Sequence, residues 1–263
     1  YLLGIAKYWV ENFDIDAWRL DVANEIDHHF WRRFHQEMVA LKPDFYILGE
    51  IWHTSQAWLN GDEFSGVMNY SYTTAILHHF INHELSSNQM IEQLSTQLMK
   101  YRDQTNQMMF NVLDSHDTAR IMTLAHNNVD LVQQTFAFTF LQPGVPSIYY
   151  GTEYGMTGEN DPDCRKPMNW HPDGKAKQIF AFFQQLNELR RQNWQLLSEG
   201  ELSLQVLKNG LIEVRRQFNG RELVGLFNTS NQTVTIDGNG QEVLSQNYEG
   251  RQLTQDGFLI YRK

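Results

Sequence analysis

The sequence has very little cysteine, no long apolar run and a shortage of basic charge. One cysteine, Cys164, stands among 263 residues, so the chain forms no internal disulfide, which favours a reducing compartment such as the cytoplasm. The longest apolar candidate, Phe136 to Leu141, is far shorter than the roughly 20 residues of a membrane-spanning helix. The net charge of -10 argues against a nucleic-acid partner, because such partners need a basic surface. A disulfide scaffold is excluded, and neither a membrane nor a nucleic acid is expected as a partner.

The composition that remains is typical of a soluble globular protein. Hydrophobic residues make up 41% and charged residues 20%. The length suffices for one large domain or two smaller ones with a sizeable core. Aromatic residues make up 13%, and although most are expected in the core, a surplus suits a site on which flat sugar rings stack.

The most informative stretch runs from Phe13 to Glu25. Its apolar residues predict a strand buried on both faces, as in a parallel sheet. Arg19 and Asp21 interrupt the strand near its C-terminal end, and because residues two apart point to the same side, their side chains emerge together. A neighbouring positive charge keeps a carboxylate ionised, as a carboxylate nucleophile requires. A structural ion pair that caps the strand explains the same pattern equally well.

Hydrophobic periodicity divides the rest of the chain into helices and strands. Helices are predicted at 1–13, 27–41, 74–100 (with a break near 85–88), 118–126, 131–141 and 176–194. Further strands are predicted at 45–51, 64–70, 108–113 and 147–150, and a polar loop at 155–172. Beyond residue 197, short β runs are separated by Asn209-Gly210, Asn219-Gly220 and Asn239-Gly240, which are strong hairpin signals.

Three carboxylates each close a predicted buried strand: Asp21, Glu50 and Asp117. Glu50 follows Asp21 by 29 residues, and Asp117 follows Glu50 by 67. A (β/α)8 barrel uses about 30 residues per βα unit and carries its chemistry at the C-terminal ends of its strands. One acid at a strand end is commonly structural, whereas three at this spacing favour catalysis.

Three motifs at these positions resemble sequence regions of the α-amylase family of glycoside hydrolases (family 13). They are Asp16 to Glu25, Leu48 to His53 and Asn111 to Arg120, and they occur in the family's order. The segments Val22 to Glu25, Gly49 to His53 and Asp161 to Arg165 are most similar to the neopullulanase, cyclomaltodextrinase and maltogenic amylase branch. The resemblance extends from Tyr1 to about Trp194, and the tail resembles the family's C-terminal β domain.

The resemblance implies an α/β fold and a substrate class. Residues 1–197 are expected to be the C-terminal part of a (β/α)8 TIM barrel with about five strands, and residues 198–263 a small antiparallel β-sandwich domain. The implied partners are α-glucan oligosaccharides or polysaccharides such as maltodextrin, cyclodextrin and pullulan.

Carried over residue by residue, the resemblance makes Asp21 the nucleophile, Glu50 the general acid/base and Asp117 the transition-state stabiliser. A retaining glycosidase needs one ionised and one protonated carboxyl group. Arg19 is expected to keep Asp21 charged. Glu50 follows an apolar strand, where desolvation is expected to raise its pKa and preserve a proton.

The resemblance places seven further residues on the substrate: Arg19, Glu25, Trp52, His53, His116, Asp161 and Arg165. Core packing is the competing interpretation for Trp52, and a solvated loop position is the competing one for Glu25 and His53. A solvated loop ion pair explains Asp161 and Arg165 nearly as well.

No metal and no cofactor is expected. The pairs His28-His29 and His78-His79 are interpreted as helix-surface residues, because nothing supplies the remaining ligands at a usable spacing. A structural calcium ion in a longer parent enzyme is compatible with the family but not indicated by these residues.

About five barrel strands are predicted where eight close a barrel, and the chain begins at Tyr1 without Met. We therefore expect the C-terminal part of a longer enzyme, with open sheet edges that favour self-association. Two alternatives to a hydrolase remain: an inactive or merely carbohydrate-binding fragment, and a parent that is mainly a transglycosylase.

Overall fold

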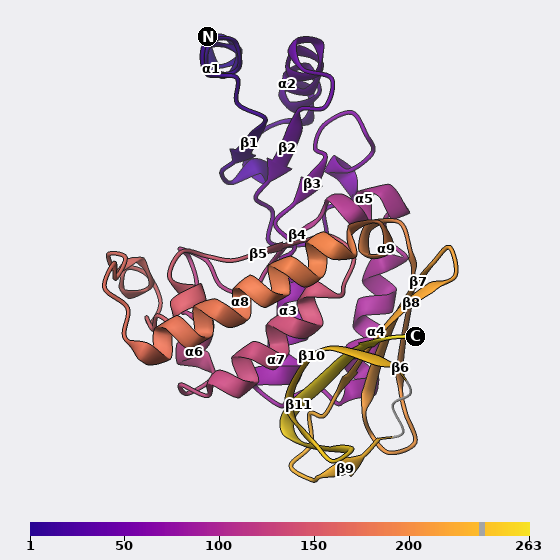
Figure 1. Ribbon diagram of the computed structural model, residues 1–263. Helices are drawn as coiled ribbons and strands as arrows, with labels where there is room; N and C mark the ends of the chain where they lie inside the picture. Colours follow the sequence, from indigo (N-terminus) through magenta and orange to yellow (C-terminus); the bar gives the residue numbers. More distant parts are fainter. Residues whose placement is uncertain (237–239) are drawn as a thin grey trace.

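Five short parallel strands follow one another in chain order through the first part of the molecule (Figure 1). The computed structural model describes residues 1–236 and 240–263. β1 (Ala17–Leu20), β2 (Tyr46–Gly49) and β3 (Gly66–Val67) form one parallel sheet, and β4 (Phe110–Val112) pairs in parallel with β5 (Val145–Ser147). An isolated parallel bridge between Met68 and Phe110 joins the two groups. This matches the predicted number and direction of strands, although the strands of the described residues do not close into a barrel.

The first two helices cover β1 and β2 and make a separate core. α1 (Leu2–Phe13) and α2 (His28–Leu41) pack on each other, and Asp27 begins α2 by accepting a hydrogen bond from the backbone N–H of Phe30. Apolar side chains of α2 meet those of β2 in this core, which includes Trp31, Phe34, Met38 and Ile47. In Figure 1 this unit projects from one end of the molecule, with the N-terminus at its tip.

A second, larger core surrounds one buried helix, α7 (Val129–Phe140). Besides α2 and the strands already named, the elements between β1 and α7 are η1 (Ala23–Glu25), η2 (Gln56–Trp58), α3 (Tyr70–Ile76), the π-helical turn η3 (Leu77–Ile81), α4 (Ser87–Leu98), α5 (Asp103–Met108) and α6 (Ile121–Leu124). After β5 come η4 (Thr152–Tyr154), η5 (Asp163–Arg165), α8 (Gly174–Gln192) and α9 (Trp194–Ser198). None of the helices in the described residues is long and apolar enough for a membrane crossing.

The last part of the chain is an antiparallel sheet of six strands, ordered β10-β11-β8-β7-β6 with β9 on β11. The strands are β6 (Glu201–Val206), β7 (Ile212–Phe218), β8 (Arg221–Phe227), β9 (Val234–Thr235), β10 (Gln241–Glu249) and β11 (Gln252–Arg262). One face contributes Phe227 and Phe258 to the core around α7, and the other carries a smaller apolar cluster. Figure 1 shows the sheet lying against α7.

The described strands form one hydrogen-bonded sheet. Helices cover one of its apolar faces, and the other face carries a buried cluster made only of residues from the C-terminal part of the chain. Its division into the two packed layers of a β-sandwich stays a prediction. The Asn219-Gly220 hairpin is confirmed, with positive φ at both residues. Gly210 also has the positive φ expected of its turn. The expected turn at Asn239-Gly240 begins outside the described residues.

Several predicted boundaries were wrong by a few residues. β1 is half-buried rather than buried on both faces, since β2 is its one strand partner in the described residues. β5 begins at Val145 and not at Ser147, and Pro146 is tolerated because an edge strand needs fewer backbone donors. Of the predicted strand at 64–70, only the two residues of β3 form a strand, and α3 already begins at Tyr70.

Candidate active site

Arg19 links two of the predicted acids at the ends of neighbouring strands. The register of β1 and β2 pairs Leu20 with Gly49, which brings Asp21 and Glu50 to the same end of the sheet. Arg19 Nη1 lies 2.5 Å from Asp21 Oδ1, and its Nη2 lies 3.0 Å from Glu50 Oε2. The structure therefore brings these three side chains together.

The backbone after Asp21 is held in an unusual conformation around Glu50. Val22 has φ 44° and ψ 45°, a left-handed conformation that β-branched residues rarely adopt. Its N–H donates to Glu50 Oε2 at 2.9 Å, and the next N–H, of Ala23, donates to the Glu50 carbonyl at 3.1 Å. Strain of this kind persists where the surroundings over-determine it, as at functional sites.

Asp21 and Glu50 have contrasting surroundings. The Asp21 side chain is 72% exposed, whereas that of Glu50 is 6% exposed. The hydrogen bond from Arg19 is the main cause that holds the pKa of Asp21 below its ordinary value, with smaller contributions from Glu50 and His116. One acid is thus an exposed carboxylate at neutral pH, and the other is a buried carboxyl group beside it.

Asp117 lies in the loop after β4 and contacts the side chains of His116 and Arg165. Its carboxylate is 3.1 Å from His116 Nε2 and accepts a hydrogen bond of 2.9 Å from Arg165 Nη2. Arg165 Nε also pairs with Asp161 Oδ1 at 2.8 Å. The predicted Asp161–Arg165 ion pair therefore exists, and Arg165 extends it to Asp117.

An aromatic pair lies beside Glu50. The Trp52 ring stacks on Tyr70 with centroids 3.8 Å apart and planes 7° apart, and Trp52 Nε1 donates to Glu50 Oε1 at 3.2 Å. Tyr70 is buried, and burial is the main cause that raises its pKa, with Glu50 and Asp117 adding to it. Trp52, at 49% exposed, is thus not a core residue.

Sequence reasoning missed Tyr70, although its position after the third strand was a usable signal. It also placed Glu25 and His53 near the substrate, and no contact of theirs reaches the acids. Both are exposed: Glu25 accepts from Asn24, and His53 contacts the Thr54 carbonyl.

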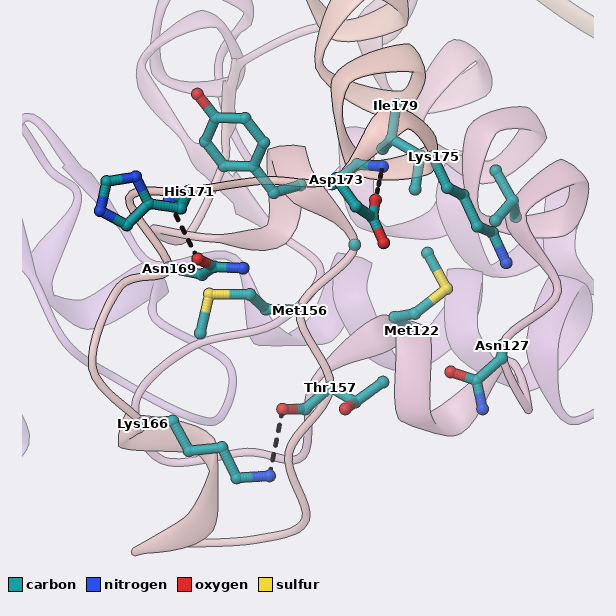
Figure 2. A pocket seen from close by; sticks show the side chains of 14 residues that line it. Met122, Asn127, Met156, Thr157, Lys166, Asn169, His171, Asp173, Lys175 and Ile179 are labelled. Carbon is teal, nitrogen blue, oxygen red and sulfur yellow. Dashed lines mark hydrogen bonds between the residues drawn. The ribbon is translucent and has the colours of Figure 1, made fainter.

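A cavity of about 400 Å³ lies away from the acids, between the loop before α8 and the start of that helix. Figure 2 shows its lining, which includes Met122, Asn127, Asn169, His171 and Lys175 and none of the three acids. No group of His, Cys, Asp and Glu side chains among residues 1–236 and 240–263 is arranged to hold a metal ion.

Comparisons with known proteins show which family the chain resembles. Residues 1–200 match the family model described as alpha amylase, catalytic domain. The intracellular maltogenic amylase of Bacillus subtilis (strain 168) is 46% identical over 233 residues, covering 88% of this chain and 40% of that protein. The cyclomaltodextrinase of Thermoanaerobacter pseudethanolicus (strain ATCC 33223 / 39E) is 39% identical over 261 residues, covering 99% and 45%.

A solved structure of a cyclomaltodextrinase superimposes with a TM-score of 0.84 at 35% identity, covering 100% of this chain and 46% of that one. The chain thus spans less than half the length of each of these three relatives. With a catalytic-domain model matching three quarters of its residues and relatives this similar, the chain belongs to the alpha-amylase family of glycoside hydrolases.

Proposed function

We propose that the protein containing this chain is a retaining α-glycosidase that acts on α-glucans by double displacement. Asp21 is the nucleophile, Glu50 the general acid/base and Asp117 the transition-state stabiliser. The observation that carries the proposal is Arg19, which contacts the exposed Asp21 carboxylate and the buried Glu50 carboxyl group at once.

The roles follow from the surroundings of each acid. Asp21 attacks the anomeric carbon while Glu50 protonates the departing oxygen, and Glu50 then removes a proton from the water that releases the sugar. Asp117 and His116, which contact each other and Arg165, bind hydroxyl groups next to the reacting carbon. Trp52, exposed and stacked on Tyr70, offers its outer face to a sugar ring.

The names of the relatives support the proposed substrate and location, and the proposed domain division is the one expected from the sequence. Relatives named maltogenic amylase and cyclomaltodextrinase support maltodextrin and cyclodextrin as substrates. One relative is named as intracellular, in keeping with a cytoplasmic location. Residues 1–197 then form part of the catalytic barrel and residues 198–263 a C-terminal β domain.

A second candidate function applies to the 263-residue chain by itself. The 72% exposure of Asp21 leaves one side of the site without a wall in the described structure. A chain of this length alone then binds α-glucans weakly or turns them over at trace rates, while the longer protein is the hydrolase.

Product analysis tests the proposal. The longer protein is incubated with maltodextrin, cyclodextrin or pullulan, and ¹H NMR follows the anomeric configuration of the first product. We expect the first product to have the α configuration, and we expect Asp21→Asn to form no product. A first product of β configuration would mean inversion and would overturn the double-displacement assignment. Transfer to added maltose in place of water would favour a transglycosylase.

A further inference from the structure

Arg120 is a fully buried arginine whose guanidinium joins two other loops. Its Nε donates to the Cys164 carbonyl at 2.9 Å, and its Nη1 donates to the Tyr150 carbonyl at 2.5 Å. The guanidinium carbon lies 3.9 Å from the centre of the Tyr149 ring. A buried charge is costly unless it is well bound, so these contacts indicate a specific structural task.

The turn that contains the Cys164 carbonyl also contacts His116 and Asp117. Cys164 Sγ and the neighbouring Arg165 Nε both donate to the His116 carbonyl, at 3.1 and 2.8 Å. Arg165 Nη2 then donates to Asp117. The turn that Arg120 holds is therefore the turn that orients His116 and Asp117.

Asp114 and Thr152 fasten the same loop from its other side. Asp114 Oδ2 accepts from the Ile121 N–H at 3.1 Å and from Thr152 Oγ1 at 2.8 Å. Thr152 Oγ1 also lies 3.4 Å from Arg120 Nη1. The ends of the segment 114–121 are thus tied to the segment after β5.

We propose that Arg120 is a positioning residue for the reaction: through the Cys164 carbonyl it fixes Arg165 and His116 in the geometry that Asp117 requires. Arg120 itself does not touch the substrate, because it is completely buried. The proposal rests on the proposed function of Asp117, since its kinetic consequence appears in turnover.

A double-mutant cycle tests the route. In the longer protein, Arg120→Lys keeps the charge but removes the planar set of donors, and we expect kcat to fall about 10²-fold with KM changed less than about 3-fold. In an Arg165→Ala background the same substitution is expected to lower kcat by less than about 10-fold, because the contact of Arg165 with Asp117 is already lost and only the contact of Cys164 with His116 remains. The proposal would be overturned if the loss in kcat of the double mutant equalled the product of the losses of the two single variants. Normal turnover in Arg120→Lys would also overturn it.

A second substitution and a control keep the test decisive. Arg120→Met keeps much of the side-chain length but has neither the donors nor the buried charge, so it replaces Arg120→Lys in the cycle if that variant does not fold. Arg33→Lys, at an exposed position on α2, is the matched control and is expected to behave as wild type.

Hydrogen exchange supplies a readout that needs no substrate. Amides of residues 114–120 are expected to exchange faster in Arg120→Lys than in Arg33→Lys, while those of α2 stay unchanged. Equal exchange in the two variants would refute the positioning role. Absence of turnover in the wild-type protein would instead refute the proposed function, and the exchange result would still decide this inference.

Discussion

At the scale of single residues, Arg19 distinguishes the two carboxyl groups that it contacts. Asp21 is exposed, and its bond with Arg19 keeps it ionised. Glu50 is buried and meets the Val22 N–H and the Trp52 indole as well as Arg19. Two acids in such different surroundings suit different roles, as a retaining mechanism requires.

Loss of Glu50 is expected to depend on the leaving group. In Glu50→Gln, turnover of maltodextrin should fall about 10²–10⁴-fold, because a sugar leaving group needs protonation. Hydrolysis of an activated aryl glycoside should lose much less in its first step, which burst kinetics isolates. Asp161→Asn provides a comparison in which both substrates are affected alike. Equal losses for Glu50→Gln on the two substrates would contradict its assignment.

Asp114 is expected to make stability depend on pH. Burial raises its pKa from 3.8 to about 6, and Arg120 and Glu153 are the charged groups that face it. Between these values the folded chain binds more protons than the unfolded one, so the stabilising contribution is complete below about pH 4 and is lost as the pH rises to about 6. The expected loss is about 3 kcal/mol.

Urea unfolding at pH 4 and pH 7 checks this expectation. Asp114→Asn should remove that part of the pH dependence, whereas Asp44→Asn, at an exposed position, should leave it in place. If the free energy of unfolding of Asp114→Asn changed between pH 4 and pH 7 as much as that of the wild-type protein, the Asp114 carboxyl group would not be the source of the pH dependence.

At the scale of elements, the sequence predicted what depends on local pattern. Buried apolar runs located β1, β2 and β4, and the acids after them followed from the rule that strand ends carry the chemistry. The contacts of Asp21 and Glu50 with Arg19 are observed, while the catalytic roles of the three acids remain predictions.

What the sequence could not predict depends on tertiary contacts. Tyr70 was missed because β3 has only two residues and a helix follows directly. Arg120 was missed because periodicity does not indicate a buried arginine, whose acceptors are carbonyls 30 and 44 residues away in the chain. The packing of the C-terminal sheet on helices such as α7 was not predicted, because it depends on contacts between residues far apart in the chain.

Helix α7 ties the parallel strands to the C-terminal sheet, so a cavity there should destabilise both. The Phe138 ring lies 5.2 Å from that of Phe80 and 5.4 Å from that of Phe227. We expect Phe138→Ala to lower the free energy of unfolding by about 3–5 kcal/mol. Met99→Ala, at an 85% exposed position, should change it by less than about 0.5 kcal/mol.

Fluorescence and far-UV circular dichroism during urea unfolding distinguish the outcomes. A single transition that shifts equally in both signals supports one shared core. Two separate transitions, of which Phe138→Ala moves only one, would show that the sheet folds independently.

At the scale of the whole molecule, the projecting unit presents apolar surface to solvent. Tyr8, Trp9 and Phe13 on α1 contact one another and are between 41% and 57% exposed. β1 beside them has an unpaired edge in the described residues. Apolar surface next to an open sheet edge favours association.

The printed chain by itself is therefore expected to associate and to have at most a trace of the longer protein's activity. Analytical ultracentrifugation should show dimers or larger species, and Trp9→Glu should shift them toward monomer. Trp170→Glu, at an exposed loop position remote from α1, should not. A strictly monomeric chain with full turnover of maltodextrin would contradict this account.

Covalent trapping tests whether Asp21 is the nucleophile. The longer protein is treated with a 5-fluoro-α-glucosyl fluoride, digested and mapped by mass spectrometry, with Asp21→Asn as the control. The account predicts a glycosyl ester on Asp21 that accumulates in the wild-type protein and is missing in the variant. A glycosyl adduct on any other residue would contradict the assignment of Asp21 as the nucleophile.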